Sequence, residues 1–306
     1  MSMYISHYKN GNYLVTINRK DGTKLRISQE DIFIPNRVES MDVKITNMCH
    51  HNCEFCHENS NPYGHTASFS NIIKFASTLP IYTEIALGGG NLMEVPTFTH
   101  NCLMIFKKYN AICSITIRQD DFITYYDTIK DWMNEKLIYG IGVSLTNAKD
   151  DRLWDLLEKT PNAVLHTIVG MLTSFEINKI KEHKPKILIL GYKNIRRGKN
   201  FLKTNELEIH LKTEHLKNHI IELMTACDIC SFDNLALEQL DIQSKVNKTD
   251  WETYYMGDDG TTTFYVDLVR MEYAISSTHL YPERFPIGNK SVQEMYDHII
   301  SLKGEE

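Results

Sequence analysis

Three cysteines lie close together in the stretch Cys49-His-His-Asn-Cys53-Glu-Phe-Cys56. Their spacing, Cx3Cx2C, allows three thiolates on one loop to converge on a single metal centre. An iron–sulfur cube usually takes four cysteines. A cube held by only three therefore leaves one iron open to a small chelating ligand.

Neighbouring histidines leave a second metal chemistry open. With one of His50, His51 or His57, the cysteines would supply the four ligands of a structural zinc site. Structural zinc sites favour paired Cx2C motifs, whereas this stretch has one Cx2C with a third cysteine four residues before it. The spacing favours the cluster and keeps zinc as the alternative.

The chain around the cysteines alternates between short apolar strands and amphipathic helices. We predict strands at 41–46, 83–87, 111–118, 139–145, 163–169, 186–190 and 234–240, and helices near 70–79, 96–109, 123–135, 150–159, 174–183 and 206–225. Such alternation indicates parallel strands joined by right-handed crossovers. The expected fold is α/β, a partial (β/α)6-type TIM-like barrel with small β-containing extensions at both ends. In barrels of this kind the chemistry gathers at the C-terminal ends of the strands.

Shorter segments flank the predicted barrel. Residues 1–40 alternate in polarity around an Asp-Gly turn signal at 21–22, so we expect an N-terminal β-hairpin extension. The barrel would span 41–240. Residues 241–306, where the alternation stops and no cysteine occurs, would form a C-terminal extension without cluster ligands.

The cysteine motif, placed after the first strand of a parallel α/β domain, resembles the radical SAM superfamily. The resemblance implies that Cys49, Cys53 and Cys56 hold one [4Fe-4S] cluster, whose fourth iron is chelated by S-adenosylmethionine (SAM). It implies reduction of SAM to methionine and a 5′-deoxyadenosyl radical that abstracts a substrate hydrogen. Phe55 matches the aromatic position near the adenine. A flavodoxin or ferredoxin would serve as electron donor.

Other positions match the family's contacts with SAM. The segment Gly88-Gly89-Gly90-Asn91 stands where the family has a Gly-Gly-Glu-like segment that contacts the methionine amino group, largely through its backbone. Glu is missing from that position here, so the resemblance implies backbone contacts only. It further implies, in chain order, Arg118 beside the SAM carboxylate, Ser144 at the ribose or carboxylate, Ile168 and Gly170 beside the adenine, and Tyr192, whose backbone touches the adenine.

Two clusters of reactive residue types lie late in the predicted barrel. Cys227 and Cys230 form a second close pair, but no cysteine follows them. We therefore expect them to pack in the interior and the chain to carry one cluster. The basic stretch from Lys193 to Lys199, with Arg196 and Arg197, would meet an anionic substrate group or only solvent.

The charge and hydropathy of the chain limit the kinds of partner that we expect. The 306 residues carry 33 Lys and Arg against 39 Asp and Glu, a net charge of −6, which gives no strong nucleic-acid signal. No apolar run approaches the roughly 18 residues of a membrane span. The start of the chain lacks a secretory signal, so we expect a cytoplasmic protein with reduced thiols and no membrane partner.

The substrate is open at this level. The β extensions favour a peptide or protein substrate, as in maturases of ribosomally made peptides, because an exposed strand edge is a common peptide-docking surface. The alternative is a nucleotide or small metabolite. A hypothesis from a different class is a zinc-stabilised, non-catalytic binding module.

Overall fold

The computed structural model describes residues 4–20, 22–30 and 32–304. The strands are β1 (Ile5–Asn10), β2 (Tyr13–Asn18), β3 (Lys24–Ile27), β4 (Ser40–Thr46), β5 (Glu84–Gly89), β6 (Ile112–Arg118), β7 (Gly140–Ser144), β8 (Ala163–Ile168), β9 (Lys186–Leu190), β10 (Ile229–Phe232), β11 (Thr263–Asp267), β12 (Glu272–Ala274) and β13 (Phe285–Pro286). The helices are α1 (Phe69–Ala76), α2 (Pro96–Lys108), α3 (Gln119–Thr124), α4 (Tyr126–Asn134), α5 (Asp151–Lys159), α6 (Ser174–His183), α7 (Arg196–Ala226), α8 (Asn234–Leu240), α9 (Ile242–Lys245), α10 (Lys248–Tyr254) and α11 (Val292–Lys303).

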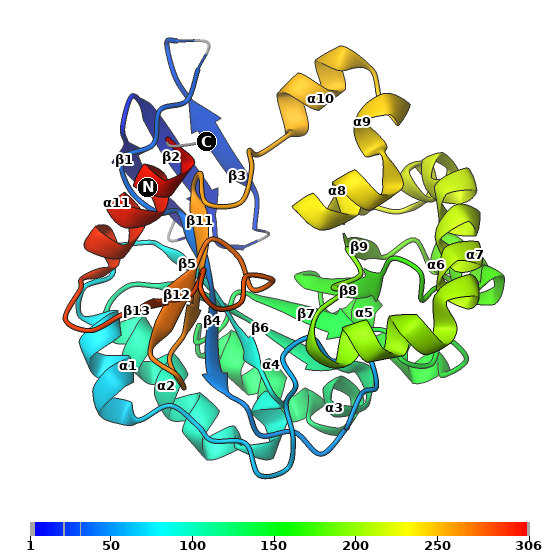
Figure 1. Ribbon diagram of the computed structural model, residues 1–306, viewed down its shortest axis with the longest axis horizontal. Coiled ribbons are helices and arrows are strands. Elements are labelled where there is room, and N and C mark those ends of the chain that lie inside the picture. Colours follow the sequence, from blue (N-terminus) through cyan, green and yellow to red (C-terminus); the bar gives the residue numbers. More distant parts are fainter. Residues whose placement is uncertain (1–3, 21, 31, 305–306) are drawn as a thin grey trace.

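The main sheet has ten strands in the order β10-β9-β8-β7-β6-β5-β4-β11-β12-β13 (Figure 1). Every pairing from β10 through to β11 is parallel. The strands from β4 to β9 alternate with helices along the chain. The predicted partial α/β barrel is therefore confirmed.

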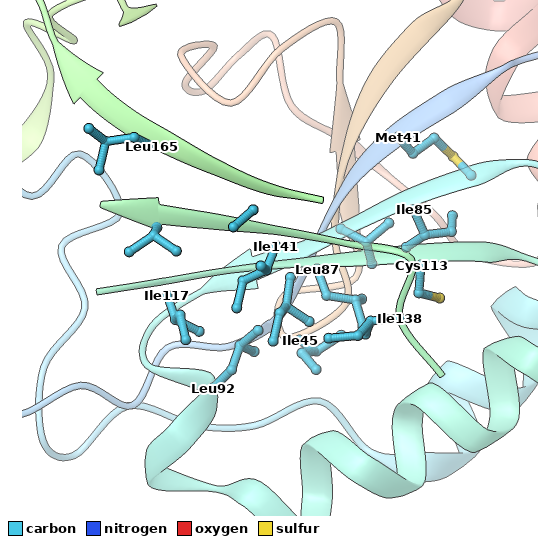
Figure 2. Packing of buried hydrophobic residues seen from close by; sticks show 14 of the residues in the cluster. Met41, Ile45, Ile85, Leu87, Leu92, Cys113, Ile117, Ile138, Ile141 and Leu165 are labelled. Carbon is cyan, nitrogen blue, oxygen red and sulfur yellow. The ribbon is translucent and has the colours of Figure 1, made fainter. Parts of the chain in front are cut away.

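The barrel's outer layer is an apolar core between strands and helices. Along β4, Met41, Val43 and Ile45 are buried in the same cluster as Phe75 and Phe106 of the covering helices. Figure 2 shows Met41 and Ile45 beside apolar side chains of the neighbouring strands, such as Ile85 and Leu87 of β5. Because strand side chains alternate, the residues between them point into the barrel. This alternation places polar side chains of β4 on the inner face.

The N-terminal extension is a three-stranded antiparallel sheet, β1-β2-β3, rather than the expected hairpin. The predicted turn includes Asp21, which lies outside the described residues. Tyr13, Val15 and Ile17 of β2 pack against Ile112 at the start of β6. The extension therefore covers the N-terminal end of the barrel strands, away from the cysteines.

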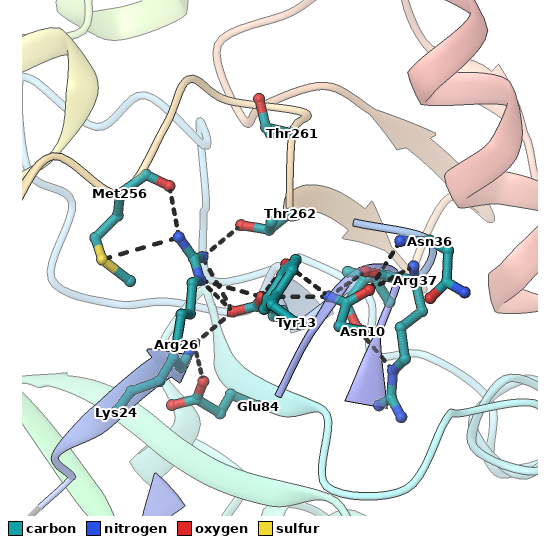
Figure 3. A network of polar contacts seen from close by, with 12 residues as sticks. Asn10, Tyr13, Lys24, Arg26, Asn36, Arg37, Glu84, Met256, Thr261 and Thr262 are labelled. Atoms are coloured by element: carbon teal, nitrogen blue, oxygen red, sulfur yellow. Dashed lines mark hydrogen bonds and ion pairs between the residues drawn. The ribbon is translucent and has the colours of Figure 1, made fainter. Parts of the chain in front are cut away.

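Glu39, immediately before β4, ties this extension to the barrel. Its buried carboxylate accepts hydrogen bonds from Tyr13 Oη at 2.6 Å and Arg26 Nη2 at 3.0 Å, and it pairs with Lys24 Nζ at 3.4 Å. Figure 3 shows these partners converging. Burial alone would raise the pKa of Glu39, but Lys24 and Arg26 outweigh it and the pKa is lowered. The carboxylate is thus charged and paired.

Two predictions about the C-terminal third were wrong. Residues 234–240 are the helix α8, and the strand lies just before them at β10. The short apolar run Leu235-Ala-Leu237 is compatible with both the strand and the helix periodicity. The helix forms because Asp233 caps it, accepting a hydrogen bond from Ala236 N at 2.8 Å. The sheet also continues past residue 240, because β11 pairs with β4.

Two helices differ from their predicted extents. The stretch 123–135 is split into α3 and α4 at Tyr125, and α7 begins at Arg196, ten residues earlier than expected, with non-helical geometry at Asn205. Polar residues before Asn205 hide this first segment from a search for apolar periodicity. Among the described residues, no helix is long and apolar enough to cross a membrane.

Candidate radical SAM site

The three cysteines lie on one loop that begins where β4 ends. Backbone bonds from Asn47 N to His65 O (2.8 Å) and from Cys49 N to Asn61 O (3.0 Å) close the loop on itself. All three thiols are free and partly exposed. Burial raises the pKa of Cys49, and the nearby charges of Glu94, Cys53 and Cys56 add to the effect. The thiols are close enough to repel one another as thiolates, a repulsion that metal binding would relieve.

Three arginines from other elements contact this loop. Arg118, at the end of β6, donates from Nη1 to Cys53 Sγ at 3.2 Å and from Nη2 to Asp120 at 3.0 Å. At the start of α7, Arg196 donates to His57 O at 2.6 Å and Arg197 to Asn52 Oδ1 at 2.7 Å and to a further loop carbonyl. The ends of β6 and α7 therefore anchor the cysteine loop through three guanidinium groups.

This use of α7 changes the expectation for the basic stretch. Arg196 and Arg197 are engaged by the cysteine loop rather than held ready for a substrate anion. Lys193 donates to Ser277 Oγ at 2.9 Å, and Lys199 is exposed. The carboxylate contact predicted for Arg118 stays a prediction, since its guanidinium now lies on Cys53.

The neighbouring histidines are held by carboxylates. His50 Nδ1 and Glu94 Oε2 are 2.5 Å apart, and Glu94 also accepts from His50 N at 2.7 Å. His51 Nε2 lies 2.8 Å from Asp121 and 2.9 Å from Asn91 Nδ2. In the described chain, no three His, Cys, Asp or Glu side chains gather closely enough to hold a single metal ion. This finding covers the three cysteines as well as the histidines, so it bears equally on zinc and on a cluster.

The glycine segment divides into one open position and two packed ones. A Cβ at Gly88 would meet nothing within 4 Å. At Gly89, with φ of +118°, it would lie 2.3 Å from Thr46 O, and at Gly90 it would lie 2.2 Å from Met48 O. Gly89 and Gly90 thus allow the end of β5 to approach the cysteine loop, while only Gly88 leaves space for a ligand.

Three predicted residues lie at adjoining C-terminal ends of strands. Ser144 is paired with Arg118 across β6 and β7, and with His166 across β7 and β8. Ile168 is half-buried at the end of β8. His166 was not predicted as a site residue. Its ring lies against Gly142, where a Cβ would be 2.2 Å from it. Burial lowers the pKa of His166 to about 4, so the ring is neutral at pH 7.

The structure gives two other predicted residues packing roles. A Cβ at Gly170 would lie 2.7 Å from Ile209 of α7, so this glycine lets α7 approach β8. Tyr192 uses its backbone on Gln239, donating from N at 2.8 Å and accepting at O at 2.9 Å. The predicted backbone contact of Tyr192 with adenine stays a prediction. Any cofactor contact of Gly170 stays a prediction.

Phe55 lies between the second and third cysteines and packs edge-on against Phe201 of α7, with ring centroids 5.9 Å apart. The ring is half-buried. α7 therefore contacts the cysteine loop through an aromatic pair as well as through its arginines. The predicted place of Phe55 beside adenine is not tested by these contacts.

A buried ion network inside the barrel was not predicted. Lys44 Nζ lies 2.7 Å from Glu58 and 3.5 Å from Asp267, and Tyr265 Oη donates to Glu58 at 3.0 Å. Burial alone would raise the pKa of Glu58, but Lys44 outweighs it and the pKa falls to about 2. The network links the cysteine loop to β4 and β11. In the sequence, the only sign of this network was Lys44 at an inward-facing position of an apolar strand.

Solved structures share this architecture. The crystal structure of Streptococcus suis SuiB bound to S-adenosylmethionine has a TM-score of 0.63 at 10% identity, over 97% of this chain and 87% of that chain. Native anSMEcpe with bound AdoMet has a TM-score of 0.53 at 13% identity, over 85% and 79% of the two chains. The chain shares the fold of these two SAM-bound proteins.

A second SuiB structure agrees, with a TM-score of 0.56 at 11% identity. No protein-family model and no curated protein matches the chain. Within this fold, the cysteine loop follows β4 and the open glycine, Gly88, lies near the end of the neighbouring strand β5. This adjacency brings a potential metal centre and a vacant backbone cradle to one end of the barrel.

Proposed function

We propose that this chain is a radical SAM enzyme, which binds one [4Fe-4S] cluster and SAM and starts hydrogen abstraction from a substrate. The observation that carries the proposal is the loop of Cys49, Cys53 and Cys56, whose thiols are free while the adjoining histidines are bound to carboxylates. A cluster held there would supply the electron that breaks a carbon–sulfur bond of SAM.

The chain's own residues would hold and shield these groups. Arg118 would fix the position of Cys53 through its hydrogen bond to Sγ. Arg196 and Arg197 would fix the loop against α7. Gly88 would leave its backbone accessible to the methionine end of SAM.

The second cysteine pair supports a single cluster. Cys227 is buried at the end of α7, and Cys230 packs against the core from β10. Burial raises the pKa of Cys227 to about 11 and that of Cys230 to about 12, so both are protonated at neutral pH. Protonated thiols are poor metal ligands. An external one-electron donor such as a flavodoxin or ferredoxin would be the redox partner.

We favour a peptide or protein substrate over a nucleotide. β3 is an edge strand of the described N-terminal sheet and exposes Leu25 and Ile27, features that suit docking of an extended peptide. The basis for a phosphate-bearing substrate is weaker, because Arg196 and Arg197 already serve the cysteine loop.

The direct test is anaerobic reconstitution with iron and sulfide, followed by reduction with dithionite in the presence of SAM. The proposal predicts absorption near 400 nm, about four iron atoms per chain, and formation of 5′-deoxyadenosine and methionine. Colourless protein with stoichiometric zinc and no SAM cleavage would instead support the zinc-stabilised binding module.

A further inference from the structure

We propose that the substrate presents a protonated amine or a guanidinium to a group of carboxylates inside the barrel. This inference rests on the proposed function, because it assigns the substrate class of the same site. It begins from a cavity of about 920 Å³ at the open side of the barrel. The cavity lies between α8 with residues 251–259 on one side and β4 with β11 on the other.

The walls of this cavity are strongly acidic. Seven aspartate and glutamate residues line it, whereas Lys193 is the sole Lys or Arg among the described lining residues. Glu84 is neutralised by Lys24, but Asp42, Asp233 and Asp259 form no ion pair in the described part of the chain. A concave site of one charge sign, with protein walls, concentrates ligands of the opposite sign.

Asp42 is the residue that points to a ligand. It lies on the inner face of β4, and its exposed side chain lines the cavity. It has no hydrogen bond or ion pair within the described chain. Burial raises the pKa of Asp42; Lys193 opposes this, and the charges of Asp259 and Asp233 add to it. Neighbouring carboxylates without counter-charges repel one another, and a bound cation would relieve that repulsion.

Aromatic rings supply a second feature suited to a cation. Trp251 and Tyr255, both lining the cavity, are stacked with ring centroids 4.6 Å apart. Ring faces attract ammonium and guanidinium groups. Acidic and aromatic walls together match an amine or guanidinium better than a phosphate or an uncharged metabolite.

The acidic group is separate from the position expected for SAM. Asp42 is two residues before Lys44, whose pair with Glu58 lies between it and the cysteine loop along β4. The open glycine, Gly88, comes four residues after Glu84 on the neighbouring strand. Asp42 and Glu84 therefore lie near the N-terminal ends of β4 and β5, whereas the cysteines and Gly88 lie at or near the C-terminal ends of the same two strands. Asp233 follows the C-terminal end of β10.

The test uses reconstituted holoprotein at fixed ionic strength and the fluorescence of Trp251, since Trp132 and Trp154 are buried elsewhere. The probes are the peptide acetyl-Gly-Gly-Lys-Gly-Gly-amide, the same peptide with an acetylated lysine, and agmatine. The free-amine peptide is expected to bind at least about tenfold more tightly than the acetylated one, as one charge-assisted hydrogen bond allows. Asp42→Asn and Asp259→Asn should each lower this preference about tenfold.

Asp155→Asn is the matched control, because it removes one exposed carboxylate of α5 and should leave the preference unchanged. Tighter binding of agmatine than of the peptide would support the inference and assign the cation to a small molecule. Equal binding of free and acetylated peptide, or an unchanged preference in both cavity variants, would overturn it. Cluster content and SAM cleavage, measured on the same wild-type protein, test the proposed function separately.

Discussion

The cysteine loop and the cavity lie in the same barrel but differ in how their charges are paired. Arg118, Arg196 and Arg197 donate to the loop, whereas the cavity presents Asp42 and Asp259 without ion pairs in the described part of the chain. On the proposals above, the first arrangement would hold the cofactor loop in place, and the second would attract a cationic substrate.

The largest effect is expected at the cysteine loop. Cys53→Ala removes one of three thiolates, and two cannot hold the cube, so absorption near 400 nm and bound iron should fall to background. Cys230→Ala is the matched control, because that thiol packs against the core and should leave the iron content unchanged. Equal iron loss in both variants would mean that the cluster ligands are misassigned.

Substitutions of the two carboxylates near the start of β4, Glu39 and Asp42, should change the free energy of unfolding in opposite directions. Glu39→Gln breaks a buried pair with Lys24 and Arg26 and should lower the free energy of unfolding by about 3 kcal/mol. Because the pKa of Glu39 is lowered by folding, its contribution is present above about pH 4.3 and is lost as pH falls below that value. Urea unfolding at pH 7 and pH 4 measures both effects.

Asp42→Asn should act in the opposite direction. The pKa of Asp42 is raised by folding, so its charge destabilises the native state at pH 7 and this penalty disappears as pH falls through the raised pKa. The variant should therefore be more stable than wild type at pH 7, with a smaller gain at lower pH. A loss of stability like that of Glu39→Gln would show that Asp42 is structurally paired.

The glycine segment offers a matched pair of smaller changes. Gly88→Val places its side chain in open space and should weaken SAM binding about tenfold or more through crowding, with the cluster and melting temperature retained. Gly89→Val instead strains a residue at φ of +118° against Thr46 and should lower the melting temperature. Calorimetric titration with SAM separates the two, and equal SAM affinity in Gly88→Val would contradict the placement of the ligand.

The smallest expected effect concerns the reduction potential. Arg118→Met removes a cation and a donor from Cys53, so the cluster should become harder to reduce, by tens of millivolts. Lys199→Met, which removes an exposed cation near the start of α7, is the control. An EPR-monitored redox titration checks the shift; an unchanged or raised potential in Arg118→Met would argue against the contact.

Much of this arrangement could be predicted from local sequence, and each failure has a physical cause. The six strands from β4 to β9 follow apolar runs bounded by turns, which periodicity reveals within one or two residues. β11 escaped prediction as part of the barrel because its partner β4 is more than 200 residues away. The helix α8 was mistaken for a strand because a short apolar run fits both periods.

The candidate site likewise has features that local sequence predicts and features that depend on tertiary contacts. Cysteine spacing is local and was readable, and so was the position of the glycine segment after a strand. Which glycine faces open space depends on how β5 packs on the loop, a tertiary contact. The role of Arg196 and Arg197 depended on α7 folding back onto residues 52–60, which no local pattern indicates.

The most direct test of the central claim is ENDOR spectroscopy of the reduced, reconstituted protein with SAM labelled with ¹⁵N at its amino group. Three cysteine ligands leave one iron for SAM, so the account predicts a ¹⁵N coupling to the cluster that is lost when unlabelled SAM replaces it. A reduced cluster that shows no such coupling, or a protein that takes up only zinc, would contradict it.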